Sequence, residues 1–166
     1  TDLEILSSLA KRAQTTQWGK VYDFVSMAND FAFILRNELD YRREGRNADR
    51  FRKNFVHESH LYIPHIYWEY SSQRVLVLER IHGIKIDDIP ALDAADYDRH
   101  RVAVHSARVI IKEVLEDGFF HADAHPGNYN VMPGEVIGAM DFGMVGYLRD
   151  RDRLELIRLY LVAVAL

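Results

Sequence analysis

The pattern of apolar and polar positions divides the chain into helices and short strands. Where apolar residues recur every three or four positions, the spacing predicts amphipathic helices. The predicted helices cover residues 2–14, 22–45, 102–116 and about 150 onward. Gly45 and Gly118 stand at the ends of two of these segments, where glycine commonly ends a helix.

Other apolar stretches lack this spacing and predict strands. They cover residues 63–70, 74–81, 130–132 and 136–140. Pro64 lies near the start of the first, where a missing amide is tolerated. The second is apolar enough to predict a largely buried strand. Residues 84–98 predict a short acidic connection with one helical turn.

Composition narrows the class of protein. The length of 166 residues suits one domain, and 48% hydrophobic with 28% charged residues is an ordinary globular balance. A net charge of −4 gives no electrostatic reason to expect nucleic acid as a partner. The absence of cysteine excludes disulfides and thiolate chemistry.

The chain has no signal peptide and no run of the ~18 apolar residues that a membrane span needs. We therefore expect a cytoplasmic or peripheral membrane protein. The sequence starts at Thr1 rather than Met and closes within an apolar run, residues 159–166. These ends suggest a fragment of a longer protein.

Candidate chemistry lies in the stretch H-A-D-A-H-P-G-N, which starts at His121, and in a later D-F-G. Asp123 precedes Asn128 by five positions, and Asn128 precedes Asp141 by thirteen. This spacing matches the kinase pattern H-x-D-x-x-x-x-N followed by D-F-G, here closed by Gly143. We expect Asp123 to be the catalytic or water-positioning carboxylate, and Asn128 and Asp141 to bind Mg²⁺ beside ATP.

The residues between these motifs fit the same interpretation. Residues 130–132 and 136–140 read as two strands joined by a turn at 133–135. A β-hairpin would bring Asn128 and Asp141 to the same end of two paired strands.

The order of elements predicts an α+β, protein-kinase-like fold with a C-helix, hinge strands and a mostly helical C-lobe. We expect a single partial kinase-like domain, with residues 1–81 as the remnant of an N-lobe and 82–166 as the C-lobe. The backbone of Glu79, Arg80 and Ile81 would then meet an adenine. Taken on its own, that strand is better explained as part of the core.

Three stretches resemble one family, the ABC1 (UbiB/AarF/ADCK) atypical kinases. Glu38, Asp40 and the following Glu44 are similar to the family's E-x-D motif on its C-helix. Residues 120–128 are close to its F-H-A-D-P-H-P-G-N motif, and residues 141–146 to its D-F-G region. The chain departs from the pattern in two places, at Ala124, where the family commonly has proline, and at Asn130, which replaces an apolar residue.

The resemblance implies ATP and Mg²⁺ as cofactors and an accessory role in ubiquinone and isoprenoid-quinone biosynthesis, as an ATPase or small-molecule kinase. Isoprenoid-quinone precursors or lipid are the implied partners, with peripheral membrane contact through regions outside this chain. The family's K-x-G-Q helix, alanine-rich nucleotide loop and strand lysine would all precede Thr1. We therefore expect this stretch alone to be inactive.

The resemblance also implies roles for the acidic residues and histidines. Glu44 would pair with the strand lysine and so belong to the catalytic set, while Glu38 and Asp40 would meet the K-x-G-Q helix. Without the resemblance, we would favour the simpler interpretation that neighbouring arginines neutralise these acids at the surface. His121 would brace the loop, and His125 has no assigned role.

Three alternatives stay open. Aminoglycoside and choline kinases also combine H-G-D-x-x-x-x-N with an Asp on a hairpin. A metallohydrolase could use His121, Asp123, His125 and Asp141 to bind a transition metal. A non-catalytic binding module is the third. An ordinary protein kinase is disfavoured, because Ala122 replaces the usual arginine and no Ser or Thr follows Asp141.

Overall fold

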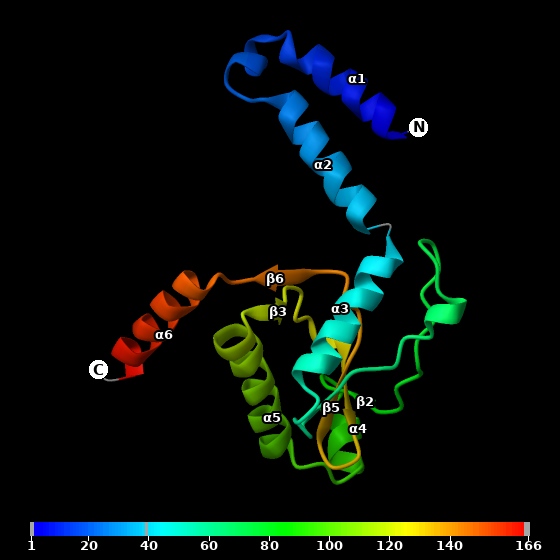
Figure 1. Ribbon diagram of the computed structural model, residues 1–166, viewed down its shortest axis with the longest axis vertical. Coiled ribbons are helices and arrows are strands. Elements are labelled where there is room, and N and C mark those ends of the chain that lie inside the picture. Colours follow the sequence, from blue (N-terminus) through cyan, green and yellow to red (C-terminus); the bar gives the residue numbers. More distant parts are fainter. Residues whose placement is uncertain (1, 39, 165–166) are drawn as a thin grey trace. The chain divides into compact units, whose positions relative to one another are not determined.

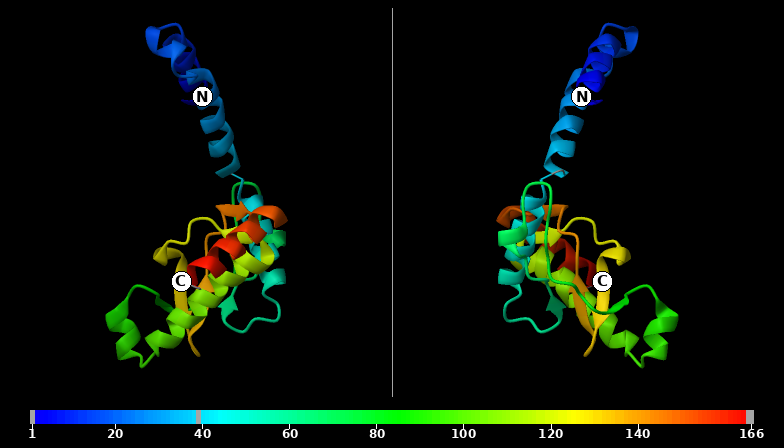
Figure 2. Two further views of the ribbon diagram at one scale, coloured as in Figure 1. Left: turned by 90° about the vertical axis from the view of Figure 1, so that its left-hand side faces the viewer. Right: turned by 90° about the vertical axis from the view of Figure 1, so that its right-hand side faces the viewer.

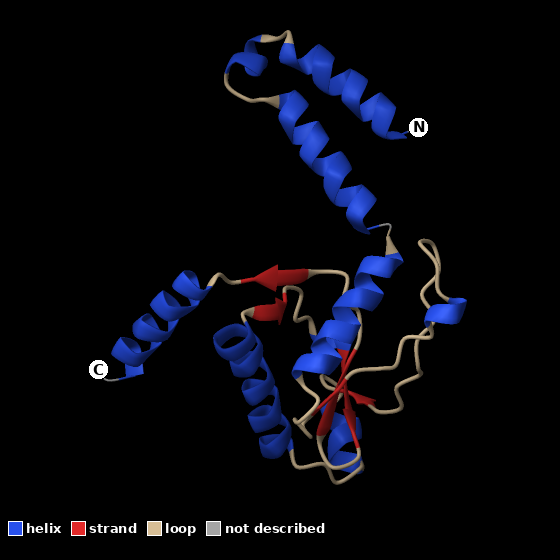
Figure 3. Ribbon diagram, viewed as in Figure 1, coloured by secondary structure: helices blue, strands red, loops and turns tan. Residues whose placement is uncertain are grey.

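The computed structural model describes residues 2–38 and 40–164, with the side chains of residues 34, 36–38 and 164 outside the description (Figure 1). The chain divides into two compact units, one ending at Tyr41 and the other beginning at Arg42. The first unit is a helical hairpin, whereas the second combines helices with short strands (Figure 3).

The first unit consists of α1 (Asp2–Gln14), the 3₁₀ turn η1 (Gln17–Lys20) and α2 (Phe24–Glu38), with α1 packed against α2. The Gln14 side-chain amide donates a 2.7 Å hydrogen bond to the Gly19 carbonyl and closes the turn. The predicted helix at residues 2–14 is confirmed.

The predicted continuous helix at residues 22–45 is wrong. Helix α2 ends at Glu38, Asp40 lies outside any helix, and a separate helix α3 (Tyr41–Asn54) follows. Helix α3 is largely charged, and its buried stripe is only Gly45, Ala48 and Phe51. So few apolar positions give little periodic signal, and the sequence pattern therefore misses the second half of α3.

Gly45 lies inside α3 and does not end a helix, which corrects the sequence-based expectation. A Cβ atom there would lie 2.7 Å from Cη2 of Trp68 and 3.1 Å from Cδ1 of Leu76. Glycine is needed because these side chains pack directly on the helix backbone.

The main sheet of the second unit has the strand order β1-β5-β4-β2. Strand β1 pairs with β5 in parallel, and the other pairs are antiparallel. The strands are β1 (Leu61–Tyr62), β2 (Ile84–Lys85), β4 (Tyr129–Met132) and β5 (Val136–Ala139). The hairpin predicted from the sequence is therefore confirmed. Its turn contains Gly134 and Glu135 with φ of 80° and 55°, in the left-handed region.

The predicted strands at residues 63–70 and 74–81 are wrong. Within them the structure has one isolated bridge, between Ile66 and Leu78, and a 3₁₀ turn η2 (Trp68–Tyr70), visible as mostly loop in Figure 3. The second stretch is not largely buried, since Val75 is 52% exposed. Aromatic and β-branched residues form strands when a sheet surface receives them. Here Trp68 and Leu76, one from each stretch, pack on α3 instead.

The C-lobe helices follow the sequence prediction closely. Helix α4 (Ile89–Ala94) lies in the predicted acidic connection. Helix α5 (Arg99–Ile111) continues as a π-helical turn η3 (Lys112–Asp117) and ends at Gly118, which has φ of 59°. Helix α6 (Asp150–Val164) closes the described chain. Helix α5 packs beside β5 (Figure 2).

A small second sheet carries the catalytic-loop motif. It pairs β3 (Phe119–His121) with β6 (Val145–Tyr147) in antiparallel fashion, a pairing that the sequence pattern did not predict. The Phe51 ring of α3 lies 4.5 Å from that of Phe119 between centroids, and the Arg50 guanidinium lies 4.1 Å from the Phe119 ring centre. Helix α3 is therefore fixed against this sheet.

No helix in the described part of the chain is both long enough and apolar enough to cross a membrane.

Candidate active site

Helix α3 holds the D-F-G segment directly. The Asn47 side-chain amide donates a 2.8 Å hydrogen bond to the carbonyl of Phe142. The Phe142 ring is 3% exposed and lies 5.2 Å from the Phe51 ring. Glu44 lies one turn before Asn47 and is half-buried. Helix α3 thus occupies the place of a kinase C-helix. Of the acidic motif residues Glu38, Asp40 and Glu44, helix α3 contains only Glu44.

The other two acidic residues of the E-x-D motif precede that helix in the sequence and are not part of it. Glu38 is the last residue of α2, and its side chain lies outside the described residues. Asp40 precedes α3 and belongs to the first unit. The expectation that Glu38, Asp40 and Glu44 all lie on one C-helix is therefore wrong.

We predict that Asn47→Ala will weaken both the fold and the site. The carbonyl of Phe142 would lose its donor, a loss of about 1–2 kcal/mol in the free energy of unfolding. The Asp141 carboxylate next to it would lose its fixed position, and Mg²⁺ affinity should fall. Urea unfolding and metal titration measure both effects. The matched control is Arg46→Ala, an exposed position on the same helix, and equal effects of the two variants would contradict the prediction.

The catalytic-loop motif begins at a buried histidine. His121 is 6% exposed, and its backbone N–H donates to Oε2 of Glu113 at 3.1 Å. Its ring Nδ1 lies 3.2 Å from the backbone N–H of Asp123, so Nδ1 accepts and the proton resides on Nε2. The ring also lies 5.8 Å from Tyr129 and 5.9 Å from Phe142. His121 therefore lies beneath the loop, in contact with its start and its end.

The loop then turns tightly around Asp123. The Asp123 carbonyl accepts hydrogen bonds from the His125 N–H at 2.7 Å and from the side-chain amide of Asn128 at 3.2 Å. His125 in turn caps the 3₁₀ turn η4 (Pro126–Asn128) by accepting from the Gly127 N–H at 3.0 Å. Asp123 itself is exposed. The loop thus presents a carboxylate to solvent on a closely hydrogen-bonded backbone.

The hairpin brings Asn128 and Asp141 to one end, as the sequence predicted. Asn128 precedes β4, and its carbonyl accepts a 2.8 Å hydrogen bond from the Met140 N–H after β5. Asp141 has a φ of 60°, in the left-handed region that non-glycine residues rarely adopt. Its Oδ1 accepts from the Gly143 N–H at 3.2 Å, and the side chain is exposed. Strained backbone of this kind is common at functional sites.

The expected hinge lies beside the same hairpin. A Cβ atom on Gly138 of β5 would lie 2.9 Å from Cγ2 of Ile81, so Ile81 packs on the hairpin. The Glu79 N–H is already bonded to the His65 carbonyl at 2.8 Å. That N–H is therefore occupied, and adenine contact through the Glu79 carbonyl and the backbone of Arg80 and Ile81 stays a prediction.

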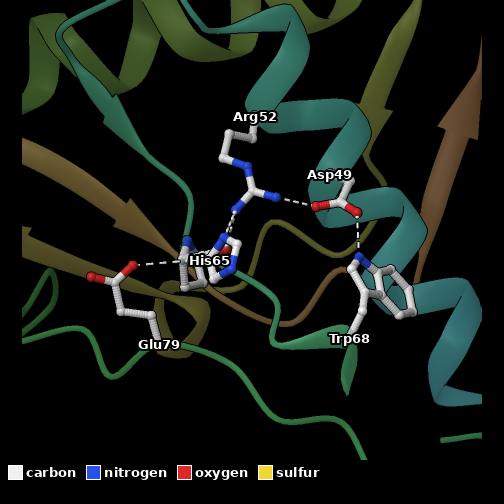
Figure 4. A network of polar contacts seen from close by, with 6 residues as sticks. Asp49, Arg52, His65, Trp68 and Glu79 are labelled. Atoms are coloured by element: carbon white, nitrogen blue, oxygen red, sulfur yellow. Dashed lines mark hydrogen bonds and ion pairs between the residues drawn. The ribbon is translucent and has the colours of Figure 1, made fainter. Parts of the chain in front are cut away.

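A polar network ties this segment to α3 (Figure 4). Glu79 accepts from the Tyr62 hydroxyl at 2.7 Å and from the His65 N–H at 3.1 Å, and these bonds hold the pKa of its carboxyl below the ordinary value. The bond to His65 is drawn in Figure 4. Arg52 lies 3.2 Å from Nδ1 of His65 and pairs with Asp49. Asp49 also accepts from the Trp68 indole at 2.7 Å.

The described residues contain no group of three or more His, Cys, Asp and Glu side chains placed to hold a metal ion. The transition-metal site suggested for His121, Asp123, His125 and Asp141 is therefore not formed among them. A kinase-type Mg²⁺ site needs fewer protein ligands, because phosphate oxygens and water complete the coordination. The amide oxygen of Asn128 and the exposed carboxylate of Asp141 lie at the same end of the hairpin and are ligands of the kind such a site requires.

Sequence reasoning missed Glu113 and Asn47. Glu113 is 6% exposed, and burial raises the pKa of its carboxyl to about 7, with the charge of Asp117 adding to the effect. Burial and the charges of Glu113 and Asp123 also raise the pKa of Tyr129. The available signal for Glu113 was an acidic residue within the apolar face of the predicted helix at 102–116.

The comparisons with known proteins agree on one family. The family model for the ABC1 atypical kinase-like domain matches residues 1–166. The chain is 38% identical to "Protein ACTIVITY OF BC1 COMPLEX KINASE 7, chloroplastic" from Arabidopsis thaliana, over 96% of the chain and 23% of that protein. It is 40% identical to a probable protein kinase UbiB from Marinobacter nauticus, over 84% of the chain and 26% of that protein. The chain thus spans about a quarter of these relatives' length.

One solved structure supports the fold. Rv3197 from Mycobacterium tuberculosis, determined in complex with erythromycin, superposes with a TM-score of 0.59 at 24% sequence identity. The match covers 87% of this chain and 37% of that one.

Proposed function

The chain belongs to the ABC1 atypical kinase-like family, and we propose that it supplies the metal-binding and base-bearing half of an ATP site. The observation that carries this proposal is the β4–β5 hairpin. It places Asn128 and Asp141 at one end, and the Asn128 amide fastens the loop that bears Asp123.

In this site Asn128 and Asp141 would hold Mg²⁺, which would neutralise charge on the β- and γ-phosphates of ATP. Asp123 would orient the attacking hydroxyl or water and accept its proton. Glu44 on α3 would complete the site by pairing with a lysine outside this chain. His121 would keep the loop in place through its bond to the Asp123 N–H.

We propose that the whole protein is an accessory factor of ubiquinone or other isoprenoid-quinone biosynthesis, acting as an ATPase or a small-molecule kinase. The similarity to UbiB proteins and the family match support this role over the aminoglycoside-kinase alternative. Quinone precursors or lipid would be its partners.

The test is calorimetric titration with MgATP, together with an assay of ATP hydrolysis, on the whole protein and on the 166-residue chain. We expect Mg²⁺-dependent binding and hydrolysis by the whole protein, abolished by a chelator. The chain alone should bind weakly, because it contains no glycine-rich phosphate loop. Chelator-resistant hydrolysis by the whole protein would contradict the metal site. Micromolar binding with steady turnover by the chain alone would contradict the division of the site.

A further inference from the structure

Glu113 is a buried carboxyl that the proposed chemistry does not use. It lies in η3, the π-helical end of α5, and is 6% exposed. A buried acid is costly unless it is paired or hydrogen-bonded. Lys112, the adjacent cation, forms its ion pairs with Asp117 at 2.9 Å and Glu116 at 3.7 Å. Glu113 instead accepts a hydrogen bond at its Oε2 from the His121 N–H.

That bond lies at the start of a short chain of contacts to Asp123. The His121 ring accepts from the Asp123 N–H, and the Asn128 amide donates to the Asp123 carbonyl. The backbone N–H and carbonyl of Asp123 are thus both hydrogen-bonded. The N–H is bonded to His121, whose own N–H donates to Glu113. The position of the exposed carboxylate depends on this arrangement.

Three elements bring titratable groups close to Glu113. Asp117 lies on its own helical turn, His121 on β3 and Tyr129 on β4. The charge of Asp123 acts on Tyr129. The pKa of Glu113 is raised to about 7, mainly by burial; the hydrogen bond from the His121 N–H lowers it and the charge of Asp117 raises it. The carboxyl therefore changes its charge close to neutral pH.

We propose that Glu113 is a positioning residue that makes the position of the Asp123 carboxylate depend on pH. This inference rests on the proposed function of Asp123. An ionised carboxylate accepts a stronger, charge-assisted hydrogen bond from the His121 N–H than the neutral acid does. Ionisation of Glu113 therefore holds the backbone at the end of β3 more firmly. The His121 ring, which accepts from the Asp123 N–H, is then held more firmly as well.

The effect on global stability has the opposite sign. With its pKa raised from 4.5 to about 7, Glu113 binds more protons in the folded than in the unfolded protein between these values. Its contribution to stability is therefore fully present below pH 4.5 and is lost as the pH rises through about 7. Above neutral pH, the ionised Glu113 carboxylate thus holds the loop more firmly but lowers the free energy of unfolding of the protein.

The structural half of the proposal is tested by NMR on the 166-residue chain. The backbone amide signals of His121 and Asp123 should shift with a midpoint near pH 7, and Glu113→Gln should remove that transition while keeping an acceptor for the His121 N–H. The matched control is Glu116→Gln, an exposed position on the same turn, which should leave the transition in place. The carboxyl carbon shift of Glu113 in the unchanged chain gives the same midpoint without a substitution. Persistence of the amide transition in Glu113→Gln would overturn the proposal.

The functional half uses ATP hydrolysis by the whole protein. The ratio of turnover between the unchanged protein and Glu113→Gln should be near one at pH 5.5, where both side chains are neutral. It should rise to roughly fivefold at pH 8.5, the scale of one charge-assisted hydrogen bond. A ratio that does not change with pH would reduce Glu113 to a structural role and overturn the proposal. A whole protein without hydrolysis at any pH would overturn the proposed function, while the NMR midpoint would still decide how Glu113 acts on the loop.

Discussion

Replacing Asp141 by asparagine is expected to abolish Mg²⁺-dependent nucleotide binding and hydrolysis in the whole protein. The carboxylate is the one charged ligand in the proposed pair with Asn128, and its charge attracts the ion. Loss of a partner outside the ligand shell typically costs ten- to a hundredfold in metal affinity, so loss of the ligand charge should cost on the order of a hundredfold or more.

This substitution isolates the charge of Asp141 from its backbone role. Asparagine tolerates the left-handed φ of 60° and keeps an oxygen that accepts from the Gly143 N–H. Asp96→Asn is a matched control, because Asp96 is also exposed and has a φ of 59°. Both variants should unfold at about the same denaturant concentration as the unchanged protein. Unchanged ATP hydrolysis in Asp141→Asn would show that the metal is held elsewhere.

The hairpin that carries this prediction could be read from the sequence because its determinants are local. Two apolar strands flank a turn whose Gly134 adopts a φ of 80° at no steric cost. The end of the π-helical turn η3 at Gly118 was predictable for the same reason. In both places a few neighbouring residues decide the backbone conformation, so the pattern along the chain is sufficient.

Where the sequence prediction failed, the deciding contacts are distant along the chain. Gly45 resembles a helix stop until Trp68 and Leu76 are seen to pack against it. The stretch at residues 74–81 has strand-forming residues but pairs through a single bridge. The pairing of β3 with β6 likewise joins segments with the whole catalytic loop and hairpin between them. Composition and periodicity contain no information on such partners.

The site shows the same division. The roles proposed for Asp123, Asn128 and Asp141 follow from spacing alone, because a linear motif fixes them. Asn47 and Glu113 act on these motifs from other helices, through bonds to Phe142 and His121. The residues expected to carry the chemistry can therefore be predicted from the sequence. The residues that hold them in place are identified only from the folded structure.

Asp123→Asn is expected to lower turnover far more than nucleotide affinity. Asp123 is exposed and its backbone, not its side chain, makes the bonds that hold the loop. The substitution should therefore leave the loop and the proposed Mg²⁺ ligands in place and remove only the group that orients the nucleophile and takes its proton. General-base catalysis typically contributes 10²–10⁴-fold, so kcat should fall by roughly a hundredfold or more.

Such a change, with KM for ATP nearly constant, is the sign of an interaction made mainly in the transition state. Steady-state kinetics and equilibrium nucleotide binding on the whole protein measure the two quantities separately. Asp87→Asn, at another exposed position in the same unit, serves as the control and should leave both unchanged. If Asp123→Asn instead weakens binding as much as turnover, the carboxylate is a metal or nucleotide ligand. The role of Asp123 as base would then be wrong, even though the motif around it is that of a kinase.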